Sequence, residues 1–274
     1  MNRMRWIIWG AIVGVCSPVQ ADPIVSFADP TRDDDGPGTY QYPTDAVYKP
    51  GSFDMTSFEV ETKGSDVIFR VGFRAKIEDP WNSKAWQGNG FSLQFVQVYV
   101  DQDHLPKSGA CEGLPGLNVR FKPESCYEKV VLLSPQGRGR LQAEVDQKAG
   151  ALAARVVIPE VTRVRGKAIE AVVDAKDLGG PPQKGWGYQV VVQSNEGYPD
   201  AKDLLTRKVN EYAGPHRFGG GSDWDCDPHV IDILVAPAKG TDAEVKGQHD
   251  ALKYQCAPAK PEASPLVELP MVYT

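Results

Sequence analysis

The chain has 274 residues, and its 30 Lys and Arg against 36 Asp and Glu give a formal charge of −6 at pH 7. Its basic residues are scattered along the sequence, whereas binding to nucleic acid or to anionic membranes requires a basic surface. We therefore exclude nucleic-acid-binding and membrane-binding proteins. A chain of this length can bury one large core, because all-β domains commonly reach ~250 residues without dividing.

The first residues predict a secretory signal peptide over residues 1–21. Arg3 and Arg5 precede the apolar run "WIIWGAIVGVC", which is too short to span a bilayer. Val19 and Ala21 then occupy the −3 and −1 positions of a cleavage site. We therefore expect cleavage after Ala21.

Cleavage leaves 274 − 21 = 253 residues, predicted to form one β-sandwich domain over residues 22–274 with an extended C-terminal tail. The formal charge becomes −8, from 28 basic and 36 acidic residues. The expected location is periplasmic, extracellular or cell-surface associated, without membrane insertion. Cys16 leaves lipidation as a minor alternative.

The mature chain opens on an acidic turn, "DPTRDDDGPGTYQYPTD" at residues 29–45. Neighbouring carboxylates repel one another, and calcium takes six to eight oxygen ligands from such turns. The turn is not an EF-hand, because Thr31 and Tyr42 stand at the first and twelfth loop positions. We predict a structural calcium site here, with a solvated acidic loop as the alternative. The expected ligands begin with Asp33, Asp34 and Asp35.

A β-hairpin is predicted next, in "FEVETKGSDVIFRVGFRAKI". Apolar residues alternate with polar ones on both sides of a turn at residues 63–65, which is the pattern of two half-buried strands.

Trp81 and Trp86 lie in the following loop, "DPWNSKAWQGNGF", among Asn, Gln and Gly. Exposed aromatic rings beside amides match the apolar faces of sugar rings, so both residues are candidate glycan-binding platforms. The alternative is that at least one of them anchors the loop in the core. Trp186 and Tyr188, at the start of a later strand, are expected in the core.

Further strands are predicted from short runs rich in Val, Ile, Leu and aromatic residues. The run "FSLQFVQVYVD" changes the phase of its alternation after Phe95, which suggests a β-bulge. The other runs are "KVVLLSP", "ALAARVVIPE", "AIEAVVDA", "WGYQVVVQS" and "VIDILVAP". Many short strands with frequent turns predict an all-β fold, an antiparallel two-sheet β-sandwich.

One or two short helices are expected. "DAKDLLTRKVNEY" has a weak amphipathic pattern, and in "TDAEVKGQHDAL" Thr241 and Glu244 form a capping-box pattern. The Pro-rich tail after residue 256 is too apolar for a free segment and is expected to lie extended across the body.

Four cysteines remain after cleavage, and an even number in an exported chain predicts two disulfides. Three pairings are possible, of which the most local joins neighbours in sequence; no zinc-site spacing is present. The four are Cys111, Cys126, Cys226 and Cys256.

Catalytic motifs of the hydrolase, metalloprotease, P-loop and dinucleotide-binding types are absent from the sequence. We therefore expect no enzymatic activity.

A second acidic run, "SDWDCDP", alternates Asp223, Asp225 and Asp227 and is a weaker candidate for a cation site.

Four blocks, "DPTRDDDGPGTYQYPTD", "KPGSFDMTSFEV", "GFSLQFVQVYVD" and "FGGGSDWDCDPHVIDILVAP", together resemble the C-terminal module of glucodextranase. The resemblance runs from about Asp22 into the tail. It implies a β-sandwich related to DOMON domains and family 9 carbohydrate-binding modules, non-catalytic and holding polysaccharide or the cell surface. Related sandwiches carry calcium near their first strands, which adds Asp54 to the expected ligands. We expect the module to stand here without an attached hydrolase.

The preferred hypothesis is thus an exported, calcium-stabilised module that binds α-glucan or a cell-envelope glycan. One alternative is a cell-surface adaptor that acts through protein contacts, with the apolar tail from Leu266 shared with a partner. A lesser one is a haem-binding DOMON-type domain, for which Met55 is the available axial ligand.

Overall fold

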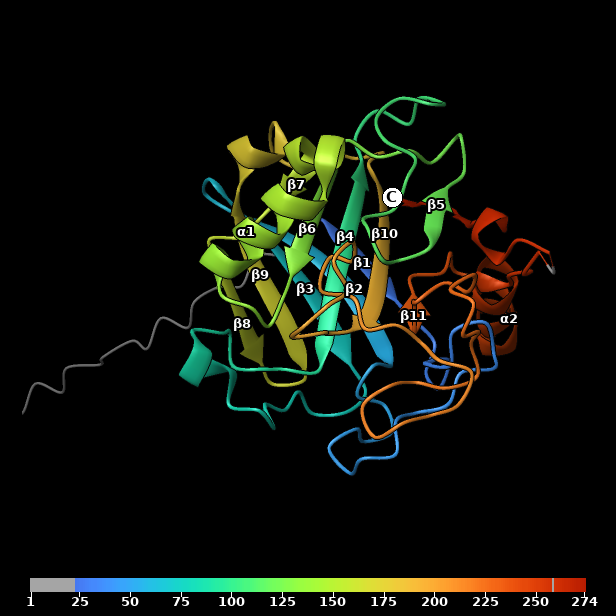
Figure 1. Cartoon of the computed structure of the whole chain (residues 1–274). Coiled ribbons are helices and arrows are strands. Elements are labelled where there is room, and N and C mark those ends of the chain that lie inside the picture. Colours follow the sequence, from blue (N-terminus) through green and yellow to red (C-terminus); the bar gives the residue numbers. More distant parts are fainter. Residues whose placement is uncertain (1–22, 258) are drawn as a thin grey trace, which may run out of the picture.

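The computed structural model describes residues 23–257 and 259–274, so the predicted signal peptide and Cys16 lie outside the described residues. Two sheets pack face to face and confirm the predicted β-sandwich (Figure 1). The first sheet is antiparallel, in the order β1 (Val25–Ala28), β2 (Met55–Lys63), β3 (Asp66–Phe73), β9 (Ala168–Asp174) and β8 (Val161–Arg165).

The second sheet is mostly antiparallel and has β10 and β4 at its centre. Its order is β11 (Asp232–Ile233), β10 (Gly187–Ser194), β4 (Gln94–Asp101), β6 (Lys129–Leu133) and β7 (Val156–Val157), and β13 (Val272–Tyr273) also pairs with β10. A separate parallel pair joins β12 (Val267–Leu269) to β5 (Val119–Phe121).

Helices are short and lie outside the two sheets. The α-helices are α1 (Arg138–Lys148) and α2 (Thr241–Leu252). The 3-10 turns are η1 (Ser83–Trp86), η2 (Gly150–Arg155), η3 (Ala175–Leu178) and η4 (Pro261–Ala263).

The main core fills the space between the sheets. Phe58 and Phe69 from the first sheet meet Tyr188 and Val98 from the second, and all four are fully buried. Trp186 is 6% exposed, so both aromatic residues expected in the core lie there.

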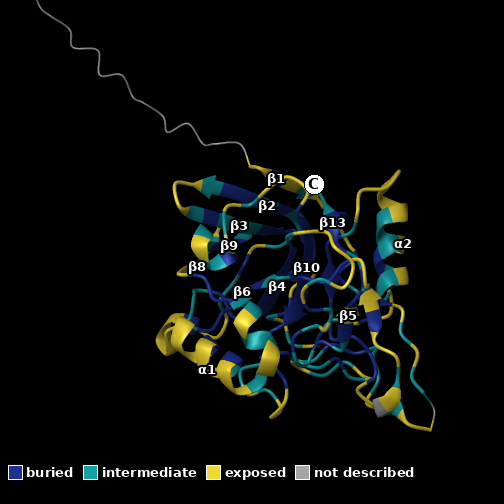
Figure 2. Cartoon of the chain, turned by 90° about the horizontal axis from the view of Figure 1, so that it is seen from above, coloured by how far each residue is buried: buried dark blue, intermediate teal, exposed yellow. Residues whose placement is uncertain are grey.

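A second core covers the outer face of the second sheet. Phe95 and Tyr99 of β4 point into it and pack with Leu141 of α1 and Leu252 of α2. In Figure 2 the central strands β4 and β10 are dark blue, while α1 and α2 carry yellow, exposed residues on their outer sides. The second sheet is therefore buried on both faces, which explains why its strands read as nearly continuous apolar runs.

This double burial corrects the predicted β-bulge. The register of β4 against β10 runs without a shift from Gln94 opposite Ser194 to Asp101 opposite Gly187. The phase of the pattern changes because Phe95 faces the second core and Val96 faces the first. The predicted hairpin, by contrast, is confirmed as β2 and β3.

The helix predictions are half right. Residues 241–252 form α2, but its N-cap is Gly240 without a side-chain cap, so the capping box is absent. Residues 200–212 are not helical: Leu205 has a left-handed φ of 54°, and Leu204, Leu205 and Val209 are buried. Burial of these residues overrides a weak helical pattern.

The C-terminal tail packs against the body of the domain. Val267, Leu269, Met271 and Val272 are buried, and β12 and β13 add to β5 and β10. The tail thus uses its apolar residues within the chain. Met55, considered above as a haem ligand, is fully buried in the main core.

Both disulfides are present in the most local pairing, Cys111–Cys126 and Cys226–Cys256. Within residues 23–257 and 259–274, none of the helices combines the length and the apolarity needed to cross a bilayer.

Candidate functional site

Four aspartates meet where the acidic turn approaches β2 and β11. We call Asp29, Asp33, Asp54 and Asp232 the acidic centre; three of them are fully buried and Asp29 is 8% exposed. Carboxylate oxygens of Asp29, Asp33 and Asp232 lie within 4.8 Å of one another.

The Gly-Pro-Gly sequence positions this centre. Gly36 has a φ of 61°, a left-handed conformation that glycine adopts without strain. Its backbone N–H donates to the carbonyl of Ile231 at 2.9 Å, which fixes the acidic turn beside Asp232. A side chain at Gly36 would collide with the ring of Tyr40.

Each carboxylate of the acidic centre has at least one oxygen without a donor among the described residues. The backbone N–H of Met55 donates to Asp232 Oδ2 at 2.6 Å, and that of Val235 donates to Asp29 Oδ1 at 3.4 Å. The other oxygens of these two residues, and both oxygens of Asp33, are buried and have no hydrogen-bond partner in this part of the chain.

Asp54 lies at the edge of the centre and is the most strongly held of the four. Its Oδ2 accepts from the backbone N–H of Arg32 at 2.9 Å and from the Arg74 guanidinium, while its Oδ1 is buried and unpaired in the described structure. Arg74 thus neutralises one of the four carboxylates.

Burial and mutual repulsion make the remaining charges unfavourable. Burial, followed by the charge of Asp54, raises the pKa of Asp33 from 3.8 to about 7. Burial and the charge of Asp33 raise the pKa of Asp29 well above its usual value. The pKa of Asp232 is also raised, by burial and by the charges of Asp29 and Asp33.

The residues present fit a hard divalent cation. Ionised carboxylates are buried in proteins only when they are paired or bind a metal. The acidic centre offers oxygen ligands, without Cys or His in the group, which suits calcium, magnesium or manganese rather than zinc. Its unpaired oxygens are the free ligand positions that such an ion uses.

The structure brings together two of the four predicted metal ligands, Asp33 and Asp54. Asp34 turns away and accepts a hydrogen bond from the hydroxyl of Tyr42. Asp35 is partly exposed and lies 3.0 Å from Nε2 of His249. The three consecutive aspartates therefore point in different directions.

The sequence reasoning did not single out Asp29 and Asp232. Asp232 interrupts the apolar run "VIDILV", and a charged residue inside a strand that reads as buried is a signal of a paired or metal-binding group. Asp29 carries no such signal, because its place beside Asp33 depends on the path of the turn.

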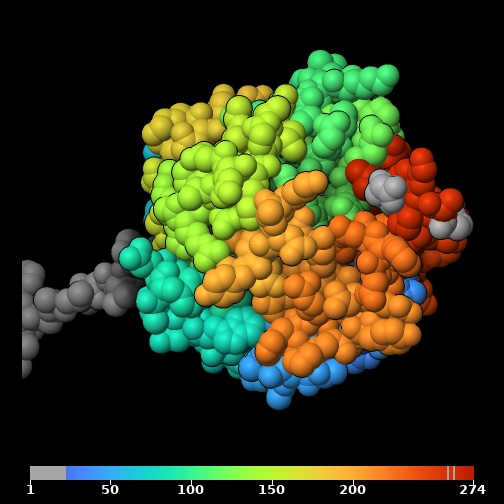
Figure 3. Space-filling model, in the orientation of Figure 1, coloured from blue at the N-terminus to red at the C-terminus, as the bar shows by residue number. Residues whose placement is uncertain are grey.

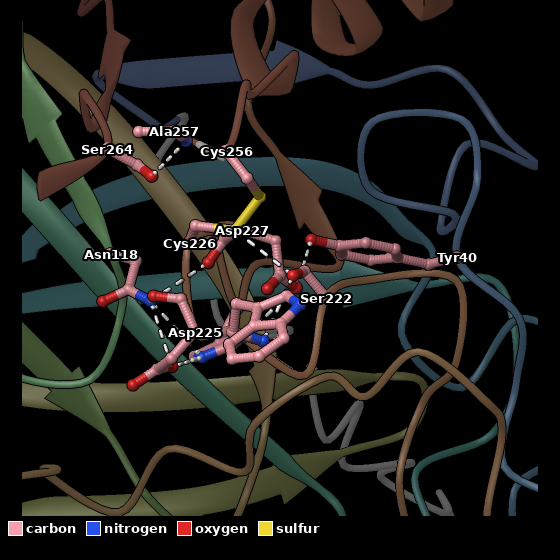
Figure 4. The surroundings of a disulfide bond; sticks show 11 residues. Tyr40, Asn118, Ser222, Asp225, Cys226, Asp227, Cys256, Ala257 and Ser264 are labelled. Atoms are coloured by element: carbon pink, nitrogen blue, oxygen red, sulfur yellow. Dashed lines mark hydrogen bonds and ion pairs between the residues drawn. A yellow bond between two sulfur atoms is a disulfide. The ribbon is translucent and has the colours of Figure 1, made fainter. Parts of the chain in front are cut away.

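The second acidic run has a different environment; Figure 4 shows its Asp225 and Asp227 beside the Cys226–Cys256 disulfide. Asp225 Oδ2 pairs with Lys208 Nζ at 2.7 Å, and its Oδ1 lies 2.7 Å from Nε2 of His229. Asp223 Oδ1 accepts from the backbone N–H of Glu211 at 2.9 Å. Hydrogen bonds from His229 and Lys208 hold the pKa of Asp225 well below its usual value. The protein's own side chains thus satisfy much of this run.

Trp81 and Trp86 line one pocket of about 320 Å³, on the surface between their loop and residues 195–207. They are 37% and 38% exposed, so neither is a core residue. Tyr198, 91% exposed, and Arg207 also line this pocket. We call it the aromatic pocket.

The loop that carries both tryptophans is fixed by its own polar contacts. Asp79 accepts from the backbone N–H and the hydroxyl of Ser83, and the backbone N–H of Gly90 donates to Ser83 Oγ at 2.9 Å. The indole N–H of Trp86 donates to the carbonyl of Trp81 at 3.3 Å. The rings are therefore held in place before any ligand arrives.

Polar groups line the aromatic pocket as well. Asn195 is 4% exposed, and its buried Oδ1 has no hydrogen-bond partner in the described structure. Glu196 pairs with Arg207 at 3.2 Å and with Arg217 at 3.4 Å. The Arg207 guanidinium lies 5.7 Å from the centre of the Trp81 ring. Aromatic walls with a few fixed polar groups are typical of a site for a polar small molecule.

A family model described as the C-terminal binding module, SLH-like, of glucodextranase matches residues 24–267. The match includes both the acidic centre and the aromatic pocket. A search of curated proteins finds no significant match.

Proposed function

The chain belongs to the family of glucodextranase C-terminal binding modules, and from this premise we propose that it is a non-catalytic module that binds polysaccharide through the aromatic pocket. The family is one of binding modules rather than catalytic domains. The substrate class that we infer is an α-glucan or a cell-envelope glycan.

The observation that carries this proposal is that two exposed tryptophans and an ion pair line the same pocket. Trp81 and Trp86 offer apolar faces to the C–H faces of a sugar ring. The Glu196–Arg207 pair, which also lines the pocket, offers both acceptors and donors for sugar hydroxyls. This combination fits a neutral, hydroxyl-rich ligand.

We also propose that the acidic centre holds a structural calcium ion. Asp29, Asp33 and Asp232 would supply carboxylate oxygens, with Asp54 at the edge of the site. The ion would neutralise carboxylates whose burial is otherwise unfavourable and would join the acidic turn to β2 and β11.

The segment between the two sites supports a scaffolding role for this ion. Residues 48–54 connect them: Asp54 belongs to the acidic centre, and the ring of Tyr48 packs against Trp81 with centroids 5.9 Å apart. Order in the acidic centre would thus stabilise one wall of the aromatic pocket.

Action outside the cytoplasm is part of the proposal. The two disulfides are of the kind that persists in oxidising compartments. Cell fractionation with N-terminal sequencing of the mature protein tests the location and the predicted cleavage after Ala21; a reduced, cytoplasmic, unprocessed chain would contradict both.

Binding is tested by retention on insoluble α-glucan and on purified cell envelope. Trp86→Ala should lose most of the retention and keep the melting temperature, because Trp86 is exposed and its ring is not part of the core. Leu105→Ala is the matched control, since Leu105 is an exposed apolar residue outside the pocket. Absence of wild-type retention on every glycan tested would end the proposal.

A further inference from the structure

Trp224 is exposed to an unusual degree for its residue type. Its side chain lies on the turn formed by residues 222–227, and the residue is 72% exposed. Exposing an indole to water forgoes the burial of a large apolar surface. A mobile turn would let this ring fold down onto the protein.

The Trp224 turn is fixed on both sides of the ring. Asp225 is held by Lys208 and His229 as described above, and Asn118 Nδ2 donates to the Asp225 carbonyl at 3.0 Å. The backbone N–H of Trp224 itself donates to Ser222 Oγ at 3.2 Å.

A covalent bond adds to these contacts. Cys226 forms the disulfide with Cys256, which ties the turn to the segment after α2 (Figure 4). The next residue, Asp227, is fully buried, and its Oδ2 lies 3.3 Å from the hydroxyl of Tyr40. The turn thus presents Trp224 to solvent in a preorganised position, which lowers the entropy cost of binding.

The Trp224 turn is linked to the aromatic pocket through one residue. Lys208 Nζ pairs with Asp225 on the turn and lies 3.3 Å from Asp200, two residues after the pocket residue Tyr198. Arg207, next to Lys208 in the chain, lines the pocket. In Figure 3 the orange segment that contains these residues forms one continuous surface.

We propose that Trp224 is a second sugar-binding platform, so that the site takes an extended polysaccharide segment rather than a single terminal sugar. This inference rests on the proposed function. Polar groups beside the ring fit a hydroxyl-rich chain. Asp223 belongs to the turn, and Asn118 donates a hydrogen bond to it. Tyr212, which is 76% exposed, adds an aromatic ring on the loop whose Glu211 backbone N–H donates to Asp223.

The test is a chain-length series of linear α-glucans, from maltose to maltoheptaose, with soluble starch as the polymer, measured by calorimetry and affinity electrophoresis. Trp224→Ala should weaken binding of the polymer and the longest oligosaccharide about fivefold to tenfold, the effect of losing one stacked ring. It should leave binding of the shortest bound oligosaccharide unchanged. Trp86→Ala should weaken binding at every length.

Trp224→Tyr is the second variant, because it keeps an aromatic face, and it should restore most of the polymer affinity. Equal weakening at all lengths by Trp224→Ala, or no weakening at any length, would overturn the inference and leave the proposed function intact. Loss of a protein partner with unchanged glucan binding would overturn it too. If the wild-type protein binds none of these glucans, the proposed function fails for this class and the inference fails with it.

Discussion

The charge of the acidic centre predicts opposite effects of one substitution in the presence and absence of calcium. Asp33→Asn removes an ionisable group whose two oxygens have no hydrogen-bond partner in the described structure. Without a divalent cation the substitution removes the cost of burying this charge and its repulsion from Asp54. With calcium bound, it removes a ligand. We therefore expect the variant to be more stable than the wild type in chelator and less stable in calcium, at pH 8.

The pKa of Asp33 sets the size and the sign of the effect. In the folded chain without a cation it rises from 3.8 to about 7, so the folded protein binds this proton more tightly than the unfolded one. The contribution of protonated Asp33 to the free energy of unfolding is then fully present below pH 4 and is lost as the pH rises through about 7. At ~1.4 kcal/mol per pKa unit, the loss is on the order of 4 kcal/mol.

Calcium should remove this loss, because the bound ion takes the place of the protons. Its binding to the folded state alone stabilises that state by ~2.7 kcal/mol at a hundredfold excess over the dissociation constant. Since the carboxylates must release protons to bind the ion, the affinity for calcium should rise between pH 5 and pH 8.

The assay is urea unfolding at pH 5 and pH 8, with calcium or with chelator. Asp35→Asn is the matched control, since Asp35 is the next acidic residue but one along the turn, is partly exposed and faces His249 instead of the centre. It should keep the full calcium response. A chelator that leaves the wild-type stability unchanged at pH 8, together with identical behaviour of the two variants, would refute the reasoning.

Two further predictions concern the parts of the fold that position the sites. Leu252→Ala in α2 should lower the free energy of unfolding by roughly 2–5 kcal/mol, because Leu252 is fully buried in the second core and the truncation leaves a cavity. Denaturant unfolding measures this change. A decrease below about 1 kcal/mol would mean that α2 contributes little to that core. Replacing Cys226 and Cys256 by Ser should cost about 3–4 kcal/mol, the chain entropy of a closed loop of 30 residues; the same measurement on the Cys111–Cys126 pair, with a separation of 15, should give a slightly smaller loss.

The spacing of apolar residues along the sequence predicted those strands and helices that bury only one face against a core. The hairpin of β2 and β3 alternates cleanly because only one face of the first sheet packs against the main core. Helix α1 was not predicted, since only Leu141 and Val145 of its 11 residues are buried, and two apolar residues give little periodicity. Residues 200–212 show the reverse case, in which apolar residues at near-helical spacing are buried by a non-helical chain.

The aromatic pocket was half predictable. Trp81 and Trp86 share a polar loop, and their joint exposure follows from that loop. Asn195 and Arg207 come from a segment more than a hundred residues later, and only the pairing of β10 with β4 brings that segment beside the tryptophans. Sequence patterns of local period cannot report such a contact.

The two acidic runs show most clearly what sequence composition leaves open. Each combines three or more aspartates with turn residues, and each was a candidate for a cation. In the folded chain Lys208 and His229 reach Asp225, so side chains of the protein compensate this carboxylate of the second run, whereas Asp227 is buried and its Oδ1 has no partner in the described residues. In the first centre, Arg74 reaches Asp54 alone, and the carboxylates of Asp29, Asp33 and Asp232 face one another without a basic side chain among their hydrogen-bond partners in the described residues. The charge balance around each run, set by residues distant in sequence, therefore favours an external cation in one place and an internal ion pair in the other.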